Sequence, residues 1–239
     1  MKPPRIYAFD SEGTLTTHAS AQGRYPSDWP LIANALGPAC LAEEDALTAR
    51  WNEQQRTGEL LVGSYIDFMR QTIEIHRMHG LTEEVFAGVL ASVPFIGGVE
   101  ETFRGIKEAN PENRIAIISG GFENRLERLP GISYVDEIRA ACKYRFDPET
   151  GLLCGWDLKE YDYAGKVTSL REIAKKYGIP LPDGGCFTGD GRNDSKIMEA
   201  VSHRIALNAH PELVQRVKEL GGVSVETNNL RDVLPYLDL

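Results

Sequence analysis

Four short polar segments carry residue types that together suit phosphate chemistry. The first, residues 10–14, reads Asp-Ser-Glu-Gly-Thr and places two carboxylates two positions apart. In such a pair, one carboxylate can attack phosphorus while the other donates a proton and later accepts one from water. Asp10 is therefore the candidate nucleophile and Glu12 the candidate general acid and base, although a solvated acidic turn can have the same sequence.

The second and third segments contain groups that could hold phosphate oxygens. Residues 115–118 are apolar, and Ser119, Gly120 and Gly121 follow them. At a helix start, a hydroxyl and exposed glycine amides can donate hydrogen bonds to an anion. Lys166 follows a glycine where a helix is predicted to begin and could supply positive charge. The ordinary alternatives are a plain strand-to-helix turn and a surface lysine.

The fourth segment is the most specific one. Residues 188–194 read Thr-Gly-Asp-Gly-Arg-Asn-Asp, so that Asp190 and Asp194 flank Asn193 around a glycine turn. Magnesium binds through a few carboxylate oxygens plus water and substrate phosphate, and this pattern suits it. A calcium-binding loop is the competing interpretation, but the distal glutamate of an EF-hand loop is missing. The third glycine of a dinucleotide fingerprint is missing as well.

Elements of an α/β protein would place these segments at one edge of a sheet. Residues 5–9 predict a buried strand that ends at the first acidic pair, and alternating strand and helix patterns resume after residue 95. Ligands of open parallel sheets bind beyond the carboxyl ends of the strands. We therefore expect a doubly wound parallel α/β core with the polar segments at that edge.

The stretch between the first strand and the rest of the core differs in character. Apolar residues recur at three- and four-residue spacings in residues 29–36, 43–55, 64–79 and 82–92, which predicts four helices. Such a stretch inside an α/β pattern indicates an insertion. We expect residues 1–16 and 95–239 to form the core and residues 17–94 to form an inserted helical-bundle cap.

Composition narrows the class of partner. The formal net charge is −9, and no Lys/Arg-rich cluster offers a track for a nucleic-acid backbone. No apolar run approaches the roughly 20 residues that span a bilayer. The four cysteines form no CxxC pair and no metal-ligand spacing. We expect a cytoplasmic protein that binds neither nucleic acid nor membrane, as a monomer or a homodimer.

The four segments, in this order, resemble the motifs of the haloacid dehalogenase superfamily, and within it the phosphoserine phosphatase group. The resemblance covers nearly the whole chain, including the helical cap and the closing segments at residues 208–211 and 226–231. It implies a Mg²⁺-dependent hydrolase of a small phosphorylated metabolite with a phosphoaspartyl intermediate on Asp10. The implied phosphate ligands are Ser119, Gly120, Lys166 and Asn193, and the implied metal site comprises Asp10, the backbone carbonyl of Glu12, Asp190 and Asp194.

Two departures from the family pattern bear on function. Most members carry aspartate where this chain has Glu12, which keeps an acid on a longer side chain. The group's substrate-recognising glutamate after the first motif has no match, so recognition of phosphoserine stays open. Arg70 is a candidate for a carboxylate-binding arginine, and His18 and Arg24 could instead read another substrate.

Alternatives to a hydrolase of this fold stay open on the sequence. A phosphotransferase or phosphomutase would use the same four segments, and a non-catalytic regulatory protein phosphorylated on aspartate is a further option. The intact Glu12, Lys166 and Asp190 argue against the regulatory protein. His76 and His79 lack the glutamate and the spacing of a zinc-protease helix, and we expect both to be surface residues.

Overall fold

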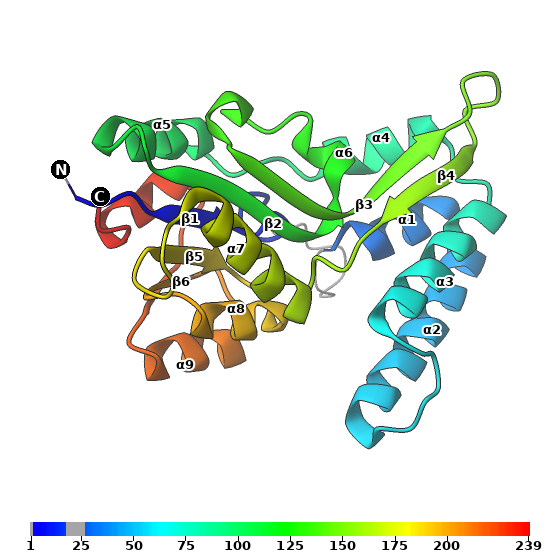
Figure 1. Ribbon diagram of the computed structural model, residues 1–239. Helices are drawn as coiled ribbons and strands as arrows, with labels where there is room; N and C mark the ends of the chain where they lie inside the picture. Colours follow the sequence, from blue (N-terminus) through cyan, green and yellow to red (C-terminus); the bar gives the residue numbers. More distant parts are fainter. Residues whose placement is uncertain (1, 18–26) are drawn as a thin grey trace. The chain divides into compact units, whose positions relative to one another are not determined.

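A mostly parallel sheet is the central feature of the fold (Figure 1). The computed structural model describes residues 2–17 and 27–239, and within them seven strands form one sheet in the order β4-β3-β2-β1-β5-β6-β7. Strand β1 pairs in parallel with β2 and with β5, and the parallel ladder continues through β6 to β7. The strands are β1 (Ile6–Phe9), β2 (Arg114–Phe122), β3 (Glu137–Phe146), β4 (Leu153–Leu158), β5 (Gly185–Gly189), β6 (His203–Leu207) and β7 (Val223–Val225).

Helices cover both faces of the parallel strands, which confirms the predicted doubly wound α/β fold. One face packs against α5 (Val99–Ala109) and the 3₁₀ helix η3 (Leu230–Tyr236). The other packs against α7 (Ala164–Tyr177), α8 (Ser195–Glu199) and α9 (Pro211–Glu219), as Figure 1 shows. The remaining short elements are α6 (Glu123–Leu126), η1 (Ile132–Tyr134) and η2 (Arg192–Asp194).

Strand β1 explains why the two apolar layers form. Its four residues are all buried, with Tyr7 and Phe9 in one layer and Ile6 and Ala8 in the other. Side chains of successive strand residues point to opposite faces, so a continuous apolar run fits a strand covered on both sides. Packing on both faces therefore holds β1 in the centre of the sheet, and the residue after Phe9 emerges at the carboxyl end of the strand.

The chain divides into two compact units. The first holds the start of the chain together with Pro94–Ala141 and Tyr161–Leu239, and the second holds the helical segment before Pro94 together with Cys142–Glu160. The second unit thus includes residues 142–160, whereas the sequence-based division places them in the core. Strand β3 begins in the first unit and ends in the second.

Four helices of the second unit lie in the stretches where periodicity predicts them. They are α1 (Asp28–Leu36), α2 (Pro38–Thr57), α3 (Tyr65–Met78) and α4 (Glu83–Ser92). Local signals set their ends: Ser64 and Asp67 form a capping box at the start of α3, and Gly58 ends α2 in the left-handed conformation. Of the helices in the described part of the chain, none has the length and apolar character needed to cross a membrane.

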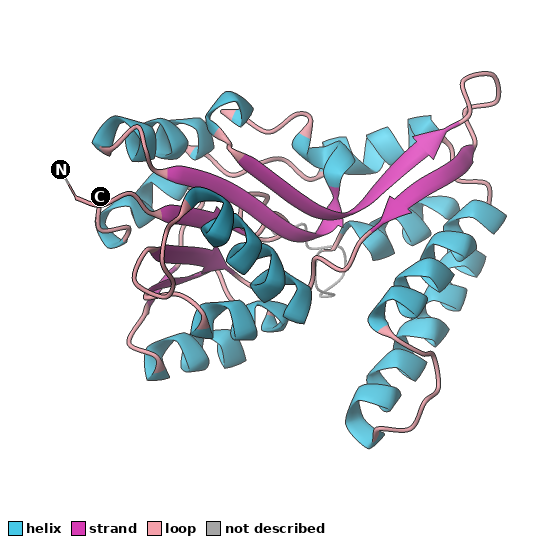
Figure 2. Cartoon of the chain, in the orientation of Figure 1, coloured by secondary structure: helices cyan, strands magenta, loops and turns pink. Residues whose placement is uncertain are grey.

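Strands β3 and β4 form an antiparallel hairpin, drawn as two adjacent arrows in Figure 2. The pairing runs from Cys142 opposite Leu158 to Phe146 opposite Leu153, with a register shift at the end of β3. The turn between the strands is held by Asp147, whose side chain accepts hydrogen bonds from the Glu149 and Thr150 amides. The sequence predicts a hairpin-like excursion here from its Asp-Pro and Thr-Gly pairs.

The prediction that His76 is a surface residue is wrong. His76 on α3 is completely buried in the second unit, with Nε2 2.8 Å from Glu44 Oε2 and Nδ1 3.0 Å from Tyr144 Oη. The ring of Trp29 stacks on the imidazole at 6.0 Å between centroids. Spacing along a single helix does not reveal that α2 and β3 bring polar partners to this histidine.

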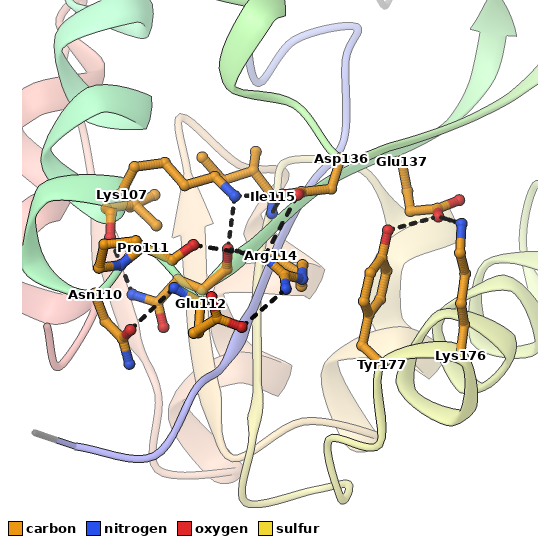
Figure 3. A network of polar contacts seen from close by, with 12 residues as sticks. Lys107, Asn110, Pro111, Glu112, Arg114, Ile115, Asp136, Glu137, Lys176 and Tyr177 are labelled. Atoms are coloured by element: carbon orange, nitrogen blue, oxygen red, sulfur yellow. Dashed lines mark hydrogen bonds and ion pairs between the residues drawn. The ribbon is translucent and has the colours of Figure 1, made fainter.

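Polar contacts fix the start of β3 in the first unit (Figure 3). The Asp136 carboxylate accepts hydrogen bonds from Lys107 Nζ at 2.7 Å and from the Ile115 amide at 2.8 Å. The buried Glu137 carboxylate contacts Lys176 and accepts a hydrogen bond from Tyr177 Oη at 2.9 Å. These contacts connect β3 with α5, with β2 and with α7.

Candidate active site

The carboxyl ends of three neighbouring strands bring the predicted segments together in the first unit. Phe9, the last residue of β1, pairs with Ile117 of β2 on one side and Thr188 of β5 on the other. The amide of Asp10 donates to the carbonyl of Thr188 at 3.0 Å. Because the strands are parallel and in this register, Asp10, Ser119 and Asp190 emerge at the same edge of the sheet.

Lys166 is the centre of a buried charge cluster. Its Nζ lies 2.8 Å from Asp10 Oδ2, 2.6 Å from Asp194 Oδ1 and 3.8 Å from Asp162 Oδ1. The side chain is fully buried in the first turn of α7, although the ordinary expectation for a lysine is solvent exposure. Helix α7 therefore directs this ammonium group to the end of β1.

Burial shifts the pKa values of this cluster. Desolvation raises the pKa of Asp10 despite the adjacent Lys166 charge, and it raises the pKa of Asp194 to about 7. The pKa of Asp190 is raised well above its ordinary value by desolvation and by the neighbouring carboxylates. Desolvation alone would lower the pKa of Lys166, but the charges of Asp10 and Asp194 outweigh it and raise that pKa. The carboxylates thus carry more buried negative charge than one ammonium group balances.

The donor set fits a small divalent cation. Carboxylate oxygens of Asp10, Asp190 and Asp194 lie within 4.8 Å of one another, with Asp10 directly after β1, Asp190 directly after β5 and Asp194 in η2. Hard oxygen ligands of this kind suit Mg²⁺. Asp194 Oδ2 also accepts the amides of Asp190 and Gly191 at 3.0 and 3.1 Å, which holds the loop in a fixed conformation. Asp190 itself accepts a hydrogen bond from Thr14 Oγ1 at 3.1 Å.

Ser119, Gly120 and Gly121 lie within the last residues of β2, whereas the sequence pattern predicts a loop at a helix start. Ser119 is buried, and its Oγ accepts the amide of Gly121 at 3.1 Å, which leaves its own O–H to donate elsewhere. A Cβ on Gly121 would lie 2.2 Å from Glu12 Oε1, so the Glu12 carboxylate occupies the space beside this glycine. The absence of a side chain at Gly121 therefore makes room for the longer acid.

Asp162 is a member of the cluster that sequence reasoning missed. It is buried two residues before the start of α7, and its Oδ1 accepts a hydrogen bond from Asn193 Nδ2 at 2.7 Å. A Cβ on Gly120 would lie 2.5 Å from Asp162 Oδ2. No motif marks this aspartate, and the available signal was its position four residues before Lys166, on the same side of a helix start.

The three candidate substrate residues are not brought into this cluster. Arg70 lies on an exposed part of α3 in the second unit, where its Nη1 pairs with Asp67 Oδ1 at 2.8 Å. His18 and Arg24 lie outside the described residues.

Sequence comparison finds relatives among curated phosphoserine phosphatases, whereas no family model matches the chain. The phosphoserine phosphatase of Idiomarina loihiensis is 28% identical over 200 residues, which cover 83% of this chain and 86% of the relative. Three further curated proteins with that name are longer, and the chain spans 45%, 49% and 37% of their lengths.

Solved structures share the fold. A substrate-bound phosphoserine phosphatase superimposes with a TM-score of 0.72 at 22% identity, and the match covers 100% of both chains. A HAD family hydrolase from Salmonella enterica serovar Typhi gives the same TM-score at 20% identity, over 98% of this chain and 72% of the other. Together with the ordered motifs and the sequence relatives, these matches establish that the chain belongs to the haloacid dehalogenase superfamily, in its phosphoserine phosphatase-like group of phosphatases.

Proposed function

We propose that the protein is a Mg²⁺-dependent hydrolase of a small phosphorylated metabolite, acting through a phosphoaspartyl intermediate on Asp10. The observation that carries this proposal is the buried contact between Asp10 and Lys166, 2.8 Å apart, inside a cluster of carboxylates suited to a cation. Phosphoryl transfer depends mainly on positioning and charge neutralisation. An acidic protein needs both at the point where a phosphate dianion binds.

Asp10 is held as a nucleophile by two contacts. Its Oδ1 accepts the amide of Ser11 at 2.7 Å, and its Oδ2 faces Lys166. These contacts orient the carboxylate and favour its ionised form against the opposing effect of burial. When bound by Asp10, Asp190 and the backbone carbonyl of Glu12, with Asp194 in support, Mg²⁺ supplies charge neutralisation for the phosphate and for the attacking carboxylate.

The remaining groups bind the phosphoryl oxygens and move the proton. The Lys166 ammonium, the Ser119 hydroxyl, the Gly120 amide and the Asn193 amide would donate to the oxygens. Glu12 protonates the leaving oxygen, and the same carboxylate then accepts a proton from the water that hydrolyses the phosphoaspartate. The position of Glu12 beside Gly121 supports this role, because it keeps the acid close to the proposed phosphate ligands Ser119 and Gly120.

We infer that the helical segment 17–94 acts as the cap that selects the substrate. Relatives named phosphoserine phosphatase support a small phosphate monoester as the substrate class. Arg70 is the proposed contact for a substrate carboxylate, and His18 and Arg24 are alternative contacts. The four free cysteines, three of them buried, support a reducing compartment such as the cytoplasm.

The nucleophile is tested by Asp10→Asn. We expect kcat on a generic aryl phosphate to fall by about 10³-fold or more, because the amide cannot form the phosphoaspartate. Acid quenching of the wild-type protein during turnover should leave a phosphoryl group on the peptide that contains Asp10. Asp183→Asn, a change on the exposed surface, is the matched control. Retention of most activity in Asp10→Asn would overturn the proposal.

Hydrolysis is distinguished from transfer by a panel of phosphorylated metabolites that includes phosphoserine, assayed with Mg²⁺ and with an added alcohol. We expect free phosphate to be the main product and chelation by EDTA to abolish it. Capture of most phosphoryl groups by the alcohol would instead identify a phosphotransferase.

A further inference from the structure

Asp162 lies where three segments that the proposed function uses come together. It immediately precedes the residue that caps α7, the helix that carries Lys166. Its Oδ1 accepts a hydrogen bond from Asn193 Nδ2 in η2, and its Oδ2 lies against Gly120 near the end of β2. All of these residues belong to the first unit. One carboxylate thus contacts three segments that come from distant parts of the sequence.

The backbone at this point is bent to make these contacts. Tyr163 has φ 46° and ψ −114°, a conformation that costs a residue other than glycine about 1–3 kcal/mol. With this bend, the Tyr163 amide donates to Asp162 Oδ1 at 2.9 Å. The same oxygen therefore receives two N–H groups, and the strained residue fixes the direction in which the carboxylate points. Strain of this kind persists where the surrounding contacts determine it.

Asn193 receives its orientation from Asp162. A side-chain amide can lie in two orientations related by a flip, and an acceptor at 2.7 Å selects the one with Nδ2 toward Asp162. The Asn193 Oδ1 then packs against Gly191, where a Cβ would lie only 2.1 Å from it. Of the two N–H bonds on Nδ2, one is directed to Asp162, and the other can donate to a phosphoryl oxygen.

A carboxylate has a cost at this position. Asp162 adds negative charge 3.8 Å from Lys166, in a site that must accept a phosphate dianion. Simple electrostatics would favour a neutral residue here. In return, Asp162 offers one acceptor oxygen on which the N–H groups of Tyr163 and Asn193 converge.

We propose that Asp162 is a positioning residue for phosphoryl binding, which acts through Asn193 by fixing the orientation of its amide against helix α7. This inference rests on the proposed function, because it takes Asn193 as a phosphate ligand. In the proposed role, Asp162 itself contacts neither the phosphoryl group nor the metal ion.

The kinetic test compares Asp162→Ala with Asp162→Asn on an aryl phosphate. The alanine variant loses the acceptor, and we expect kcat/KM to fall roughly 10- to 100-fold. The asparagine variant keeps an oxygen that can accept both N–H groups, and we expect it to stay within about threefold of wild type. Asp183→Ala, on the exposed surface, is the control. Equal losses in the two Asp162 variants would overturn the proposal, since charge rather than orientation would then matter.

A double-mutant cycle separates action through Asn193 from a general structural role. If Asp162 acts through that amide, Asp162→Ala should cost little in the Asn193→Ala background. Additive losses in the double variant would contradict the proposal. Melting temperatures of all variants, measured in parallel, should not follow the activity losses.

A readout without turnover distinguishes this inference from the proposed function. The side-chain amide resonances of Asn193 should shift in Asp162→Ala and remain near wild type in Asp162→Asn, and calorimetric binding of inorganic phosphate should weaken only in the alanine variant. If no phosphate ester were hydrolysed while these two dependences held, the proposed function would fail and the positioning role would stand. Amide resonances insensitive to Asp162→Ala would remove the positioning role whatever the activity.

Discussion

Glu12 is one methylene longer than the aspartate found at this position in most of the superfamily, and Gly121 accommodates that length. The Glu12 Oε1 lies where a Cβ on residue 121 would approach within 2.2 Å. A contact this short forces one of the two groups to move. The proposed general acid is therefore positioned partly by the absence of a side chain at Gly121 in β2.

We expect Gly121→Ala to lower kcat/KM by roughly 10- to 100-fold, because the added methyl group displaces the Glu12 carboxylate from its place beside residue 121. Shortening the acid in the same chain should relieve the collision. The double variant Glu12→Asp/Gly121→Ala should thus be more active than Gly121→Ala alone, as measured by steady-state kinetics. An equally inactive double variant would show that Gly121 matters for a reason other than the space it leaves for Glu12.

A buried hydrogen-bond network joins α2, α3 and β3. Glu44, His76 and Tyr144 are all buried, and the imidazole of His76 contacts the other two side chains. Removing His76 from this network would leave a buried carboxylate and a buried hydroxyl without this partner. This hydrogen-bond network therefore connects the helices of the second unit to its hairpin.

Substitution of His76 should destabilise this unit. We expect His76→Ala to lower the free energy of unfolding by about 3–5 kcal/mol, since Glu44 would stay buried without a partner. Tyr144→Phe should cost less, about 1 kcal/mol, because the hydrogen bond to His76 is lost while no charged group loses its partner. Urea unfolding followed by circular dichroism measures both.

The control is His79→Ala at the end of the same helix. His79 lies 3.2 Å from Glu43, whose side chain is half exposed, so its loss should change stability by less than about 1 kcal/mol. If His76→Ala and His79→Ala lowered the free energy of unfolding by similar amounts, the buried hydrogen-bond network would not be important for stability.

Strand β3 is also connected to α7 through Glu137 (Figure 3). Burial by itself would raise the pKa of Glu137, but hydrogen bonds from Lys176 and Tyr177 outweigh it and lower that pKa. A lowered pKa means that the folded state binds the proton less readily than the unfolded state. The resulting stabilisation is complete above the unfolded pKa of about 4.3 and is lost as the pH falls through the folded value.

Glu137→Gln should remove this acid dependence. We expect the variant to be less stable than wild type at pH 7, by about 1–3 kcal/mol, with the difference shrinking as the pH falls below about 4. Denaturant unfolding at a series of pH values tests this, and Glu127→Gln on the exposed surface serves as the control. A difference that stayed constant down to pH 3 would show that the contact is not electrostatic.

At the scale of the whole molecule, the site depends on segments that are more than 150 residues apart in sequence. Asp10 and Asp190 meet because β1 and β5 are adjacent parallel strands in matched register. An ion that binds only this folded arrangement stabilises the entire unit by mass action. Metal binding can therefore be measured through global unfolding, without any substrate.

We expect Mg²⁺ at about 100 times its dissociation constant to raise the free energy of unfolding by about 2.7 kcal/mol, and EDTA to reverse the increase. Asp190→Asn should lose most of this increase, because it removes a ligand and part of the negative charge. Asp157→Asn, which changes an exposed residue of the hairpin, should keep it. Thermal denaturation with and without Mg²⁺ measures the effect, and an unaltered increase in Asp190→Asn would exclude that residue as a ligand.

Local sequence patterns were enough to predict the order of helices and strands along the chain, the α/β class and the candidate site residues. These follow from local patterns: an apolar run at residues 5–9, helical periodicity between residues 29 and 92, and short motifs whose residue types together suit phosphate chemistry. Each of these signals is contained within a single element. These signals can therefore be recognised without knowing what the element packs against.

What surrounds each of these side chains is visible only in the folded protein. The burial of His76, the placement of Asp162 against Asn193 and the space beside Gly121 all arise where residues distant in sequence meet. The membership of residues 142–160 in the second unit is likewise decided by packing. The physical reason is that periodicity reports which face of an element is apolar, whereas the partners of a polar group on that face are set by the register and packing of other elements.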